Sequence, residues 1–277
     1  MGGLGNQLFQ IFAVLSYALR HKQSFLFQNC KTLLHGTHRP TYWDTLLKNL
    51  KPFLRDKSLL QCGVYQEQGF DYTELPEGLD NHKLLGYFQS WKYFQDQKDT
   101  ILALLGLPTQ IAEVREKYPQ YFAVDGTPVV IHFRIKNYKE IQDFHPLCTK
   151  EYYRAAVQHI KQHVQNPYFL VFQQPEDSEE VQSMLHDILH TGDKSITISS
   201  EIPDYKQMLL MANCKAHIIA NSTFSWWGAY LAQSETVCYP DTWFGPKAGH
   251  GAEDLPLPQW QRISCVLVSD QAQVGAT

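Results

Sequence analysis

Two short polar segments follow apolar runs that are typical of buried strands, and both carry groups that suit an anion. In the first, His132 and Arg134 stand at the end of the run VVIHF (129–133). Residues two apart on a strand point to the same face, and the planar guanidinium of Arg134 matches phosphate oxygens. The alternative is an arginine that only pairs with a surface carboxylate, which is the commoner case for a single strand-end residue.

The second segment is the polar turn after the run HIIA (217–220). Asn221, Ser222 and Thr223 close this strand and occupy the cap positions of the next helix, so their side chains and the following amides could hold a phosphate. A helix cap without a ligand is the simpler interpretation of the turn alone. Two phosphate-compatible strand ends in one half of the chain give the two interpretations about equal weight.

The second half of the chain alternates apolar runs with segments of helical periodicity. The runs at 129–133, 168–172, 195–199, 217–220 and 235–240 predict strands, and apolar residues at helical spacing lie between them. This alternation predicts an α/β domain with a parallel sheet. Ligands bind outside the carboxyl ends of the strands in such sheets, so we expect both polar segments at one crevice.

The first half gives a weaker pattern. Apolar residues at helical spacing from Leu8 to Leu19 predict an amphipathic helix, preceded by the glycine-rich GGLGNQ (2–7). Residues 30–128 carry mixed signals, and the turn AVDGTP near 122–128 marks a domain transition. We therefore predict an N-terminal lobe of residues 1–125 and a C-terminal lobe of residues 126–277.

Composition excludes several classes of protein. The 277 residues carry a formal net charge of −4, so no basic excess indicates a nucleic-acid or anionic membrane surface. The six cysteines form no CxxC pair, which argues against a zinc cluster or a disulfide scaffold. The apolar stretch from Leu8 to Leu19 is too short to cross a bilayer, and no basic segment precedes it. We therefore expect a protein of the cytoplasm or of the cytoplasmic face of a membrane.

Several kinds of catalytic motif are absent from the sequence. It contains no GxSxG elbow, no Walker A loop and no HExxH, and GGLGNQ does not have the spacing of the dinucleotide fingerprint. No two aspartates stand two apart, so the DxD arrangement that holds a divalent metal on a nucleotide diphosphate is missing. Asp177 and Glu179 in PEDSEE are close together, but a charged helix start explains them. We expect no metal and no other cofactor.

Four segments together resemble the alpha-1,2-fucosyltransferases of glycosyltransferase family 11. They are GGLGNQLFQ (2–10), GYFQSWKYF (86–94), HFR (132–134) and the long stretch that contains NSTFSWWGA (204–231). The matches occur in family order and span most of the chain. The resemblance implies a GT-B-like pair of α/β lobes with a nucleotide-binding C-terminal lobe. It also implies GDP-fucose as the donor and an inverting, metal-independent transfer to the 2-hydroxyl of a galactose residue in a glycan.

The same resemblance implies roles for individual residues. Arg134 would stabilise the charge on departing GDP, and His132 would lie beside the donor. Asp204, which with Gln207 also fits a capping box, would contact the guanine edge. Asn6 would face the cleft from the N-terminal lobe and orient donor or acceptor, although a turn cap is the alternative. The residues expected to line the diphosphate are Asn221, Ser222, Thr223, Phe224 and Ser225.

One part of the family pattern is altered. The family usually reads HxRxGDY, whereas this chain reads HFRIKNY, with Lys136 and Asn137 in place of Gly and Asp. An asparagine cannot accept a proton as a carboxylate can, so the general base stays open between Glu140, Asp143 and an SN1-like path with weak base assistance. The change also keeps open a transferase for another nucleotide sugar, or a non-catalytic glycan-binding relative.

Overall fold

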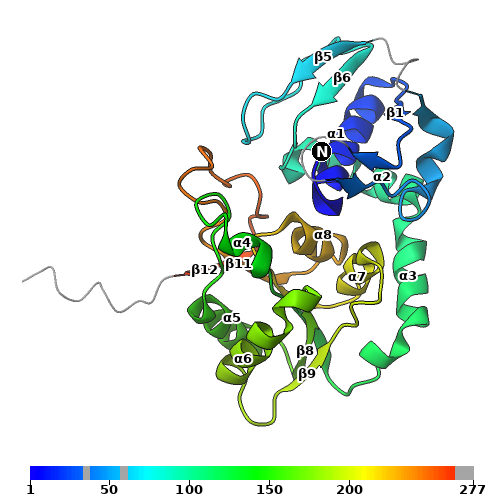
Figure 1. Cartoon of the computed structure of the whole chain (residues 1–277). Coiled ribbons are helices and arrows are strands. Elements are labelled where there is room, and N and C mark those ends of the chain that lie inside the picture. Colours follow the sequence, from blue (N-terminus) through cyan, green and yellow to red (C-terminus); the bar gives the residue numbers. More distant parts are fainter. Residues whose placement is uncertain (34–37, 57–61, 266–277) are drawn as a thin grey trace, which may run out of the picture. The chain divides into compact units, whose positions relative to one another are not determined.

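The computed structural model describes residues 1–33, 38–56 and 62–265, and the chain divides into two compact units (Figure 1). The first unit consists of Met1–Glu116 with His250–Leu257, and the second of Lys117–Gly249 with the chain from Pro258 onward. The sequence analysis divides the chain once, between residues 125 and 126. The predicted second lobe extends to residue 277, and its last residues, 266–277, lie outside the described part of the chain.

The second unit is built on a six-stranded parallel sheet, in the order β12-β11-β10-β7-β8-β9. From β7 the strand order runs to β8 and β9 at one edge, whereas from β10 it runs to β11 and β12 at the other edge. The strand order therefore reverses between β7 and β10, which is the position where doubly wound sheets bind ligands. The predicted α/β class and parallel sheet are confirmed, and the sequence analysis missed only the short, polar β12 among these strands. The strands are β7 (Thr127–His132), β8 (Pro167–Phe172), β9 (Lys194–Thr197), β10 (Ala216–Ile218), β11 (Thr236–Pro240) and β12 (Gln261–Ile263).

Two pairs of helices cover the two faces of this sheet (Figure 1). They are α5 (Lys150–His163) with α6 (Ser178–Ile188) on one face, and α7 (Asp204–Met211) with α8 (Thr223–Leu231) on the other. Alternation along β7 separates its side chains, because successive residues of a strand point to opposite faces. Ile131 and Phe133 join the apolar cluster under α5 and α6, whereas His132 bonds to a residue of α8. The strand end that carries His132 and Arg134 thus faces α8.

The aromatic residues of α8 pack in the interior. Trp226 and Trp227 are fully buried, and Tyr230 is 4% exposed. The rings of Trp226 and Tyr230 stack with centroids 4.8 Å apart, and the two tryptophan rings meet edge to face at 5.2 Å. These side chains pack against one another in the interior and are not a platform for a sugar. A rigid α8 fixes the position of the polar turn at its amino end.

Helix α8 approaches α7 closely at Gly228. A Cβ atom on this residue would lie 2.6 Å from Cβ and 2.8 Å from Sδ of Met211. Replacing Gly228 by alanine is therefore expected to destabilise the protein by about 2 kcal/mol, because overpacking outweighs the better helix propensity of alanine. Urea unfolding of the variant beside the wild type measures this loss, and equal stability would contradict the tight packing of the two helices.

The first unit contains a long helix and several short elements. Helix α1 (Leu4–His21) buries the predicted stripe, including Leu8, Phe12 and Leu15. It begins inside the glycine-rich segment, with Gly3 at its N-cap, so the predicted turn is shorter than GGLGNQ. Within the described residues, no helix combines the length and apolar character that crossing a bilayer requires.

The strands of the first unit form three separate two-stranded sheets among the residues that the structure describes. Each strand has two to four residues, which is why residues 30–128 show no clear strand periodicity. The pairs are β1 (Phe27–Gln28) with β4 (Leu54–Arg55), β2 (Thr32–Leu33) with β3 (Arg39–Pro40), and β5 (Gly63–Gln66) with β6 (His82–Leu85). The helices that follow are α2 (Lys98–Leu105) and α3 (Leu107–Lys117), and short 3₁₀ turns lie at Lys48–Phe53, Trp91–Tyr93 and Gln95–Gln97. A further 3₁₀ turn, Pro119–Tyr121, belongs to the second unit.

Candidate functional site

The carboxyl end of β7 and the amino end of α8 are in direct contact. The Nδ1 atom of His132 lies 2.8 Å from Oγ of Ser225, and that hydroxyl lies 3.3 Å from the carbonyl oxygen of Ser222. His132 is 6% exposed and Ser225 is fully buried. The ring of Phe224 lies 5.8 Å from the imidazole. The two polar segments that the sequence separates by some ninety positions therefore form one site.

Tyr138 makes the second link between the two segments. It belongs to the short helix α4 (Lys136–Lys139), and its hydroxyl donates to the carbonyl oxygen of Asn221 at 3.2 Å. The Arg134 guanidinium lies over the tyrosine ring, with Cζ 5.6 Å from the centroid. Burial raises the pKa of the Tyr138 phenol, against the opposing effect of the Arg134 charge and of hydrogen bonds with Ser222 and Arg134. A neutral tyrosine thus holds the arginine beside the turn before α8.

The Arg134 side chain has an unused donor. Its Nε atom is buried and has no hydrogen-bond partner in the described part of the chain. No described carboxylate forms an ion pair with it either, so the alternative of a surface salt bridge is not what the structure shows. A buried N–H without a partner costs free energy that a bound acceptor would recover. A guanidinium in this state is suited to an anionic ligand.

The five residues predicted to line a diphosphate divide into two groups. Ser222, Thr223 and Phe224 are partly exposed, and the Ser222 hydroxyl accepts from the Phe224 amide at 3.4 Å as the N-cap of α8. Asn221 and Ser225 are buried below them. The accessible surface of the turn therefore consists of the first group.

The Asn221 side chain is engaged with other loops, and its contact with a diphosphate stays a prediction. Its amide nitrogen donates to the carbonyl oxygens of Pro146 at 2.8 Å and Trp243 at 3.1 Å. Its oxygen lies 3.6 Å from the Cys148 thiol, and the residue is 2% exposed. An amide that joins three segments in the interior fixes the shape of the turn, so Asn221 is a positioning residue.

Asp177 is a further positioning residue, which the sequence analysis interprets only as part of a charged helix start. It closes the 3₁₀ turn η6 (Pro175–Asp177) and is 2% exposed. Its carboxylate oxygens accept from the backbone amides of Ile135 at 3.2 Å and Lys136 at 2.9 Å. The segment that directly follows Arg134 is thereby held by the turn that follows the neighbouring strand β8. No local sequence signal distinguishes this buried carboxylate from its exposed neighbours.

His132 is a neutral imidazole in the folded protein. Burial, and then the nearby charge of Arg134, lower its pKa to about 3. Its backbone oxygen accepts from the Tyr153 hydroxyl at 2.9 Å, which ties the strand end to α5. A histidine with so low a pKa is a weak base at neutral pH, so it can contribute hydrogen bonds to a ligand but is poorly suited to removing a proton.

Asp204 occupies a different position from the one predicted for it. It is the exposed first residue of α7, whose N-cap is Pro203, and its carboxylate accepts from the adjacent Tyr205 amide at 2.7 Å. Gln207 donates instead to the carbonyl oxygen of Ile202 at 2.8 Å, so the predicted capping box is wrong. Proline at the cap position leaves no side-chain acceptor there. A contact between Asp204 and a base stays a prediction.

Asn6 lies in the first turn of α1 in the first unit, inside the helix and not in a turn before it. Its Oδ1 atom accepts from Nε2 of Gln89 at 3.1 Å, which joins two of the segments that carry the family resemblance. Gly2 has a φ of +74°, and a Cβ atom there would lie 2.5 Å from Nδ2 of Asn6. Only glycine fits this close approach. Asn6 is thus held in a fixed position, and its role towards a ligand stays a prediction.

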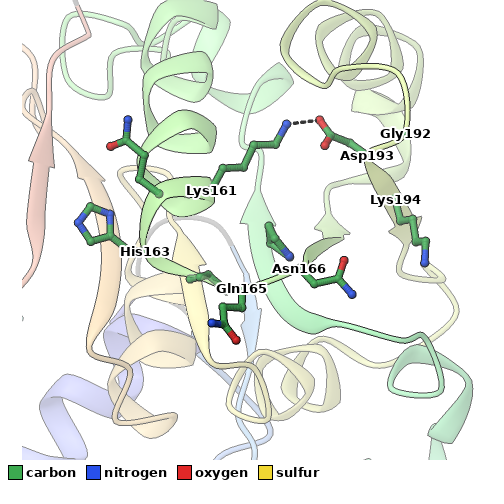
Figure 2. Close-up of a pocket in the computed structure, with 10 residues that line it drawn as sticks. Lys161, His163, Gln165, Asn166, Gly192, Asp193 and Lys194 are labelled. Carbon is green, nitrogen blue, oxygen red and sulfur yellow. Dashed lines mark hydrogen bonds and ion pairs between the residues drawn. The ribbon is translucent and has the colours of Figure 1, made fainter.

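A separate pocket with a cavity volume of about 580 Å³ lies at the opposite end of the parallel sheet (Figure 2). It is lined by residues around Pro167 and Lys194, at the amino ends of β8 and β9. Lys161 points towards Asp193 there and pairs with it at 2.5 Å. Because ligands of such sheets bind at the carboxyl ends, we do not assign the substrate site to this pocket. In the described part of the chain, no three histidine, cysteine or carboxylate side chains gather as a metal site would require.

Comparison with known proteins gives relatives over most of the chain. An alpha-1,2-colitosyltransferase of Escherichia coli is 28% identical over 186 residues, which are 65% of this chain and 62% of that protein. The O-antigen biosynthesis glycosyltransferase WbnK of Escherichia coli is 25% identical over 304 residues, covering 94% of this chain and 97% of the relative. Galactoside alpha-(1,2)-fucosyltransferase 1 of Bos taurus is 23% identical over 287 residues, covering 96% of this chain and 75% of the relative.

Two solved structures resemble this chain more distantly. They are a glycosyl transferase family 9 protein from Veillonella parvula, with a TM-score of 0.35 and 12% identity, and the ADP-heptose lps heptosyltransferase II of E. coli, with a TM-score of 0.36 and 14% identity. Each alignment covers 56% of this chain, and 40% and 43% of the two structures respectively. The sequence profile of glycosyl transferase family 11 matches residues 4–264. This match spans nearly the whole chain, including β7 and α8, whose ends contact each other. The protein is therefore a member of glycosyl transferase family 11.

Proposed function

We propose that the protein is an inverting, metal-independent fucosyltransferase that moves L-fucose from GDP-fucose to the 2-hydroxyl of a galactose residue in a glycan. The observation that carries the proposal is the meeting of Arg134 with the polar turn before α8, through Tyr138. Their strands, β7 and β10, are neighbours at the switch point of the sheet. Relatives named alpha-1,2-fucosyltransferases and an alpha-1,2-colitosyltransferase support the type of linkage.

The chemistry requires stabilisation of a leaving diphosphate. The acceptor hydroxyl attacks the anomeric carbon from the face opposite GDP, the bond to the phosphate oxygen breaks, and its electron pair stays on GDP. Negative charge therefore grows on the diphosphate as the sugar becomes oxocarbenium-like. The Arg134 guanidinium and the amides at the start of α8 are the groups that face this charge, since a helix amino end carries a positive partial charge.

The proton of the attacking hydroxyl needs a different acceptor. His132 is unsuited because its pKa is lowered to about 3 by burial and by Arg134. Asn137 has no proton-accepting oxygen of the required basicity. Glu140 and Asp143 are exposed carboxylates that follow on the same segment, and Asp143 forms an ion pair with Lys247 at 2.6 Å. We propose that one of these two accepts the proton, or that the reaction proceeds with weak base assistance.

A second candidate function is transfer of a different sugar. Of the three relatives compared above, the alpha-1,2-colitosyltransferase has the highest sequence identity to this chain. In addition, Lys136 and Asn137 replace the Gly and Asp that the family pattern has next to Arg134. A colitosyl donor would need the same stabilisation of its leaving group, so Arg134 and α8 do not distinguish the two sugars. A non-catalytic glycan-binding relative is the third possibility, and it would bind galactosides without turnover.

Thermal stability in the presence of nucleotides tests the proposed site. GDP in the presence of EDTA is expected to stabilise the protein, by about 2.7 kcal/mol at a concentration of one hundred times its Kd. UDP and ADP at the same concentration serve as controls and are expected to stabilise it less. Stabilisation that appears only when magnesium is added would contradict metal-independent binding, and stabilisation by UDP or ADP alone would contradict the proposed donor.

Turnover distinguishes the three candidate functions. The protein is incubated with GDP-fucose or GDP-colitose, with and without a β-galactoside, and the linkage of each product is determined by NMR. A fucosyltransferase consumes GDP-fucose faster when the galactoside is present and forms a 1,2 linkage. Consumption of GDP-colitose alone would select the second candidate, and galactoside binding without any product would select the third.

A further inference from the structure

A buried hydrogen-bond acceptor without a partner lies where β8 ends. The Oε1 atom of Gln174 is buried, and no described group donates a hydrogen bond to it. The Oε1 atom of the preceding Gln173 is in the same state. Buried polar atoms are nearly always paired in folded proteins, because leaving one unpaired costs stability. An exception next to a candidate ligand site indicates that the partner belongs to the ligand.

The register of the sheet places these two glutamines on opposite faces. His132 of β7 pairs with Phe172 of β8, and the amide of Phe133 donates to the Phe172 carbonyl at 2.9 Å. Gln174 keeps an extended backbone, with φ −81° and ψ 148°. Alternation therefore puts Gln174 on the face of His132 and Arg134, and puts Gln173 on the face of Phe133.

The chemistry of Gln174 complements that of Arg134. Arg134 and the amides of α8 are donors, which suit the oxygens of a diphosphate. A carboxamide oxygen only accepts hydrogen bonds, so it suits a neutral donor and not a phosphate. In a nucleoside diphosphate, the hydroxyls of the ribose and the N–H groups of the base are such donors. Gln174 thus fits the nucleoside part of the molecule whose diphosphate Arg134 fits.

The order of the strands gives the direction in which the nucleotide extends. β8 is the neighbour of β7 on the side away from β10. A diphosphate between β7 and β10 leaves the nucleoside either over β8 or over β11. Neighbouring strands are about 4.8 Å apart, so the end of β8 is within reach of a ribose attached to that diphosphate. The unpaired acceptor on β8 selects this direction.

We propose that Gln174 is a nucleoside-binding residue, whose side-chain oxygen accepts a hydrogen bond from a ribose hydroxyl or from the exocyclic amino group of the base. This assignment rests on the proposed nucleotide site between β7 and α8, and it names a contact beyond the diphosphate. The Oε1 atom of Gln174 has no partner among the described residues, so the unliganded protein gains no hydrogen bond from it. The assignment therefore predicts opposite effects of removing the amide on the stability of the unliganded protein and on its affinity for nucleotide.

Binding calorimetry on matched variants tests the assignment. Gln174→Met keeps the length of the side chain and removes the acceptor, and Gln173→Met is the control on the other face of the sheet. Gln174→Met is expected to bind GDP about fivefold to tenfold more weakly than the wild type, as the loss of one neutral hydrogen bond predicts. Its unliganded melting temperature is expected to equal or exceed that of the wild type. Gln173→Met is expected to retain wild-type affinity.

Nucleotide analogues identify the donor group. The wild type is titrated with 2′-deoxy-GDP, 3′-deoxy-GDP and inosine diphosphate, which lacks the guanine amino group. One analogue is expected to bind about fivefold to tenfold more weakly than GDP to the wild type, and equally with GDP to Gln174→Met. The analogue that shows this pattern distinguishes a ribose hydroxyl from the base amine.

Several outcomes would overturn the assignment. Unchanged GDP affinity in Gln174→Met, or an equal loss in Gln173→Met, would exclude a specific contact. A lower melting temperature with equal weakening of all the analogues would show a structural role. If the wild type binds UDP or ADP in place of GDP, the proposed donor fails while the same deoxy comparison still tests Gln174. If no nucleoside diphosphate binds, both proposals fail.

Discussion

The variant Arg134→Ala is expected to lose about one hundredfold in kcat/KM for glycosyl transfer, equivalent to about 3 kcal/mol of transition-state stabilisation. The reason is the position of the guanidinium, which lies over Tyr138 beside the amino end of α8 with its Nε atom unpaired. No described carboxylate neutralises it, so its charge is available to a leaving diphosphate. Steady-state kinetics with the donor and acceptor found by the turnover screen measure the loss.

Two further variants make this measurement specific. Arg134→Lys keeps the charge but not the planar fork, so its activity should fall between those of the wild type and of Arg134→Ala. Arg154→Ala is the matched control, because this arginine of α5 is 3.9 Å from the Glu151 carboxylate and is 40% exposed. It should leave kcat/KM unchanged. Wild-type activity in Arg134→Ala would remove the basis of the proposed mechanism.

The stability of the protein is expected to fall by about 4 kcal/mol as the pH is lowered from 8 to 5, through His132 and His217 together. Burial is the main reason why the pKa of both histidines is lowered, to about 3 for His132 and about 4 for His217. Both are neutral when folded, whereas in the unfolded chain they take up a proton near pH 6.5. Their contribution is therefore fully present above pH 6.5 and is lost as the pH falls towards the folded values.

A single substitution separates the contribution of His217 to this loss of stability from the contribution of the other titrating groups. Its ring is fully buried, with Nε2 donating to the Met211 carbonyl at 3.0 Å and Nδ1 lying 3.0 Å from the Ser234 hydroxyl. His217→Gln should lose about 2 kcal/mol less than the wild type between pH 8 and pH 5, because one titrating group is gone. The exposed His190→Gln is the control. Urea unfolding followed by circular dichroism at several pH values gives the slopes, and identical slopes in the wild type and His217→Gln would refute the assignment.

Local patterns were sufficient for most elements of the second unit. The predicted runs that became β7, β8, β9, β10 and β11 are all confirmed as strands, as are the predicted helices between them. Strand and helix periodicity depend on neighbours a few residues apart, so a single sequence contains the signal. β12 was missed because QRI (261–263) has no apolar run. The short strands of the first unit were missed for the same reason, since two to four residues are too few to show a period.

The residues of the site were predictable in type but not in their hydrogen-bond partners. Arg134 and the turn before α8 could be selected because both follow strands and both suit an anion. Asn221 was predicted to line a ligand, yet its amide bonds to Pro146 and Trp243. Asp177 was attributed to a helix start, yet it holds the segment after Arg134. These differences depend on which distant backbone groups surround a side chain, and spacing along the chain does not contain that information.

By itself, the sequence determined the α/β class, most of the strands and helices of the second unit, the two polar strand ends and membership of glycosyl transferase family 11. Only the tertiary structure decided that β7 and β10 are neighbours, and hence that His132 bonds to Ser225. It alone showed which polar atoms are paired and which, like Oε1 of Gln174, have no partner among the described residues. The physical reason is that periodicity is a local property of the chain, whereas strand order and hydrogen-bond pairing arise from contacts between segments far apart in sequence.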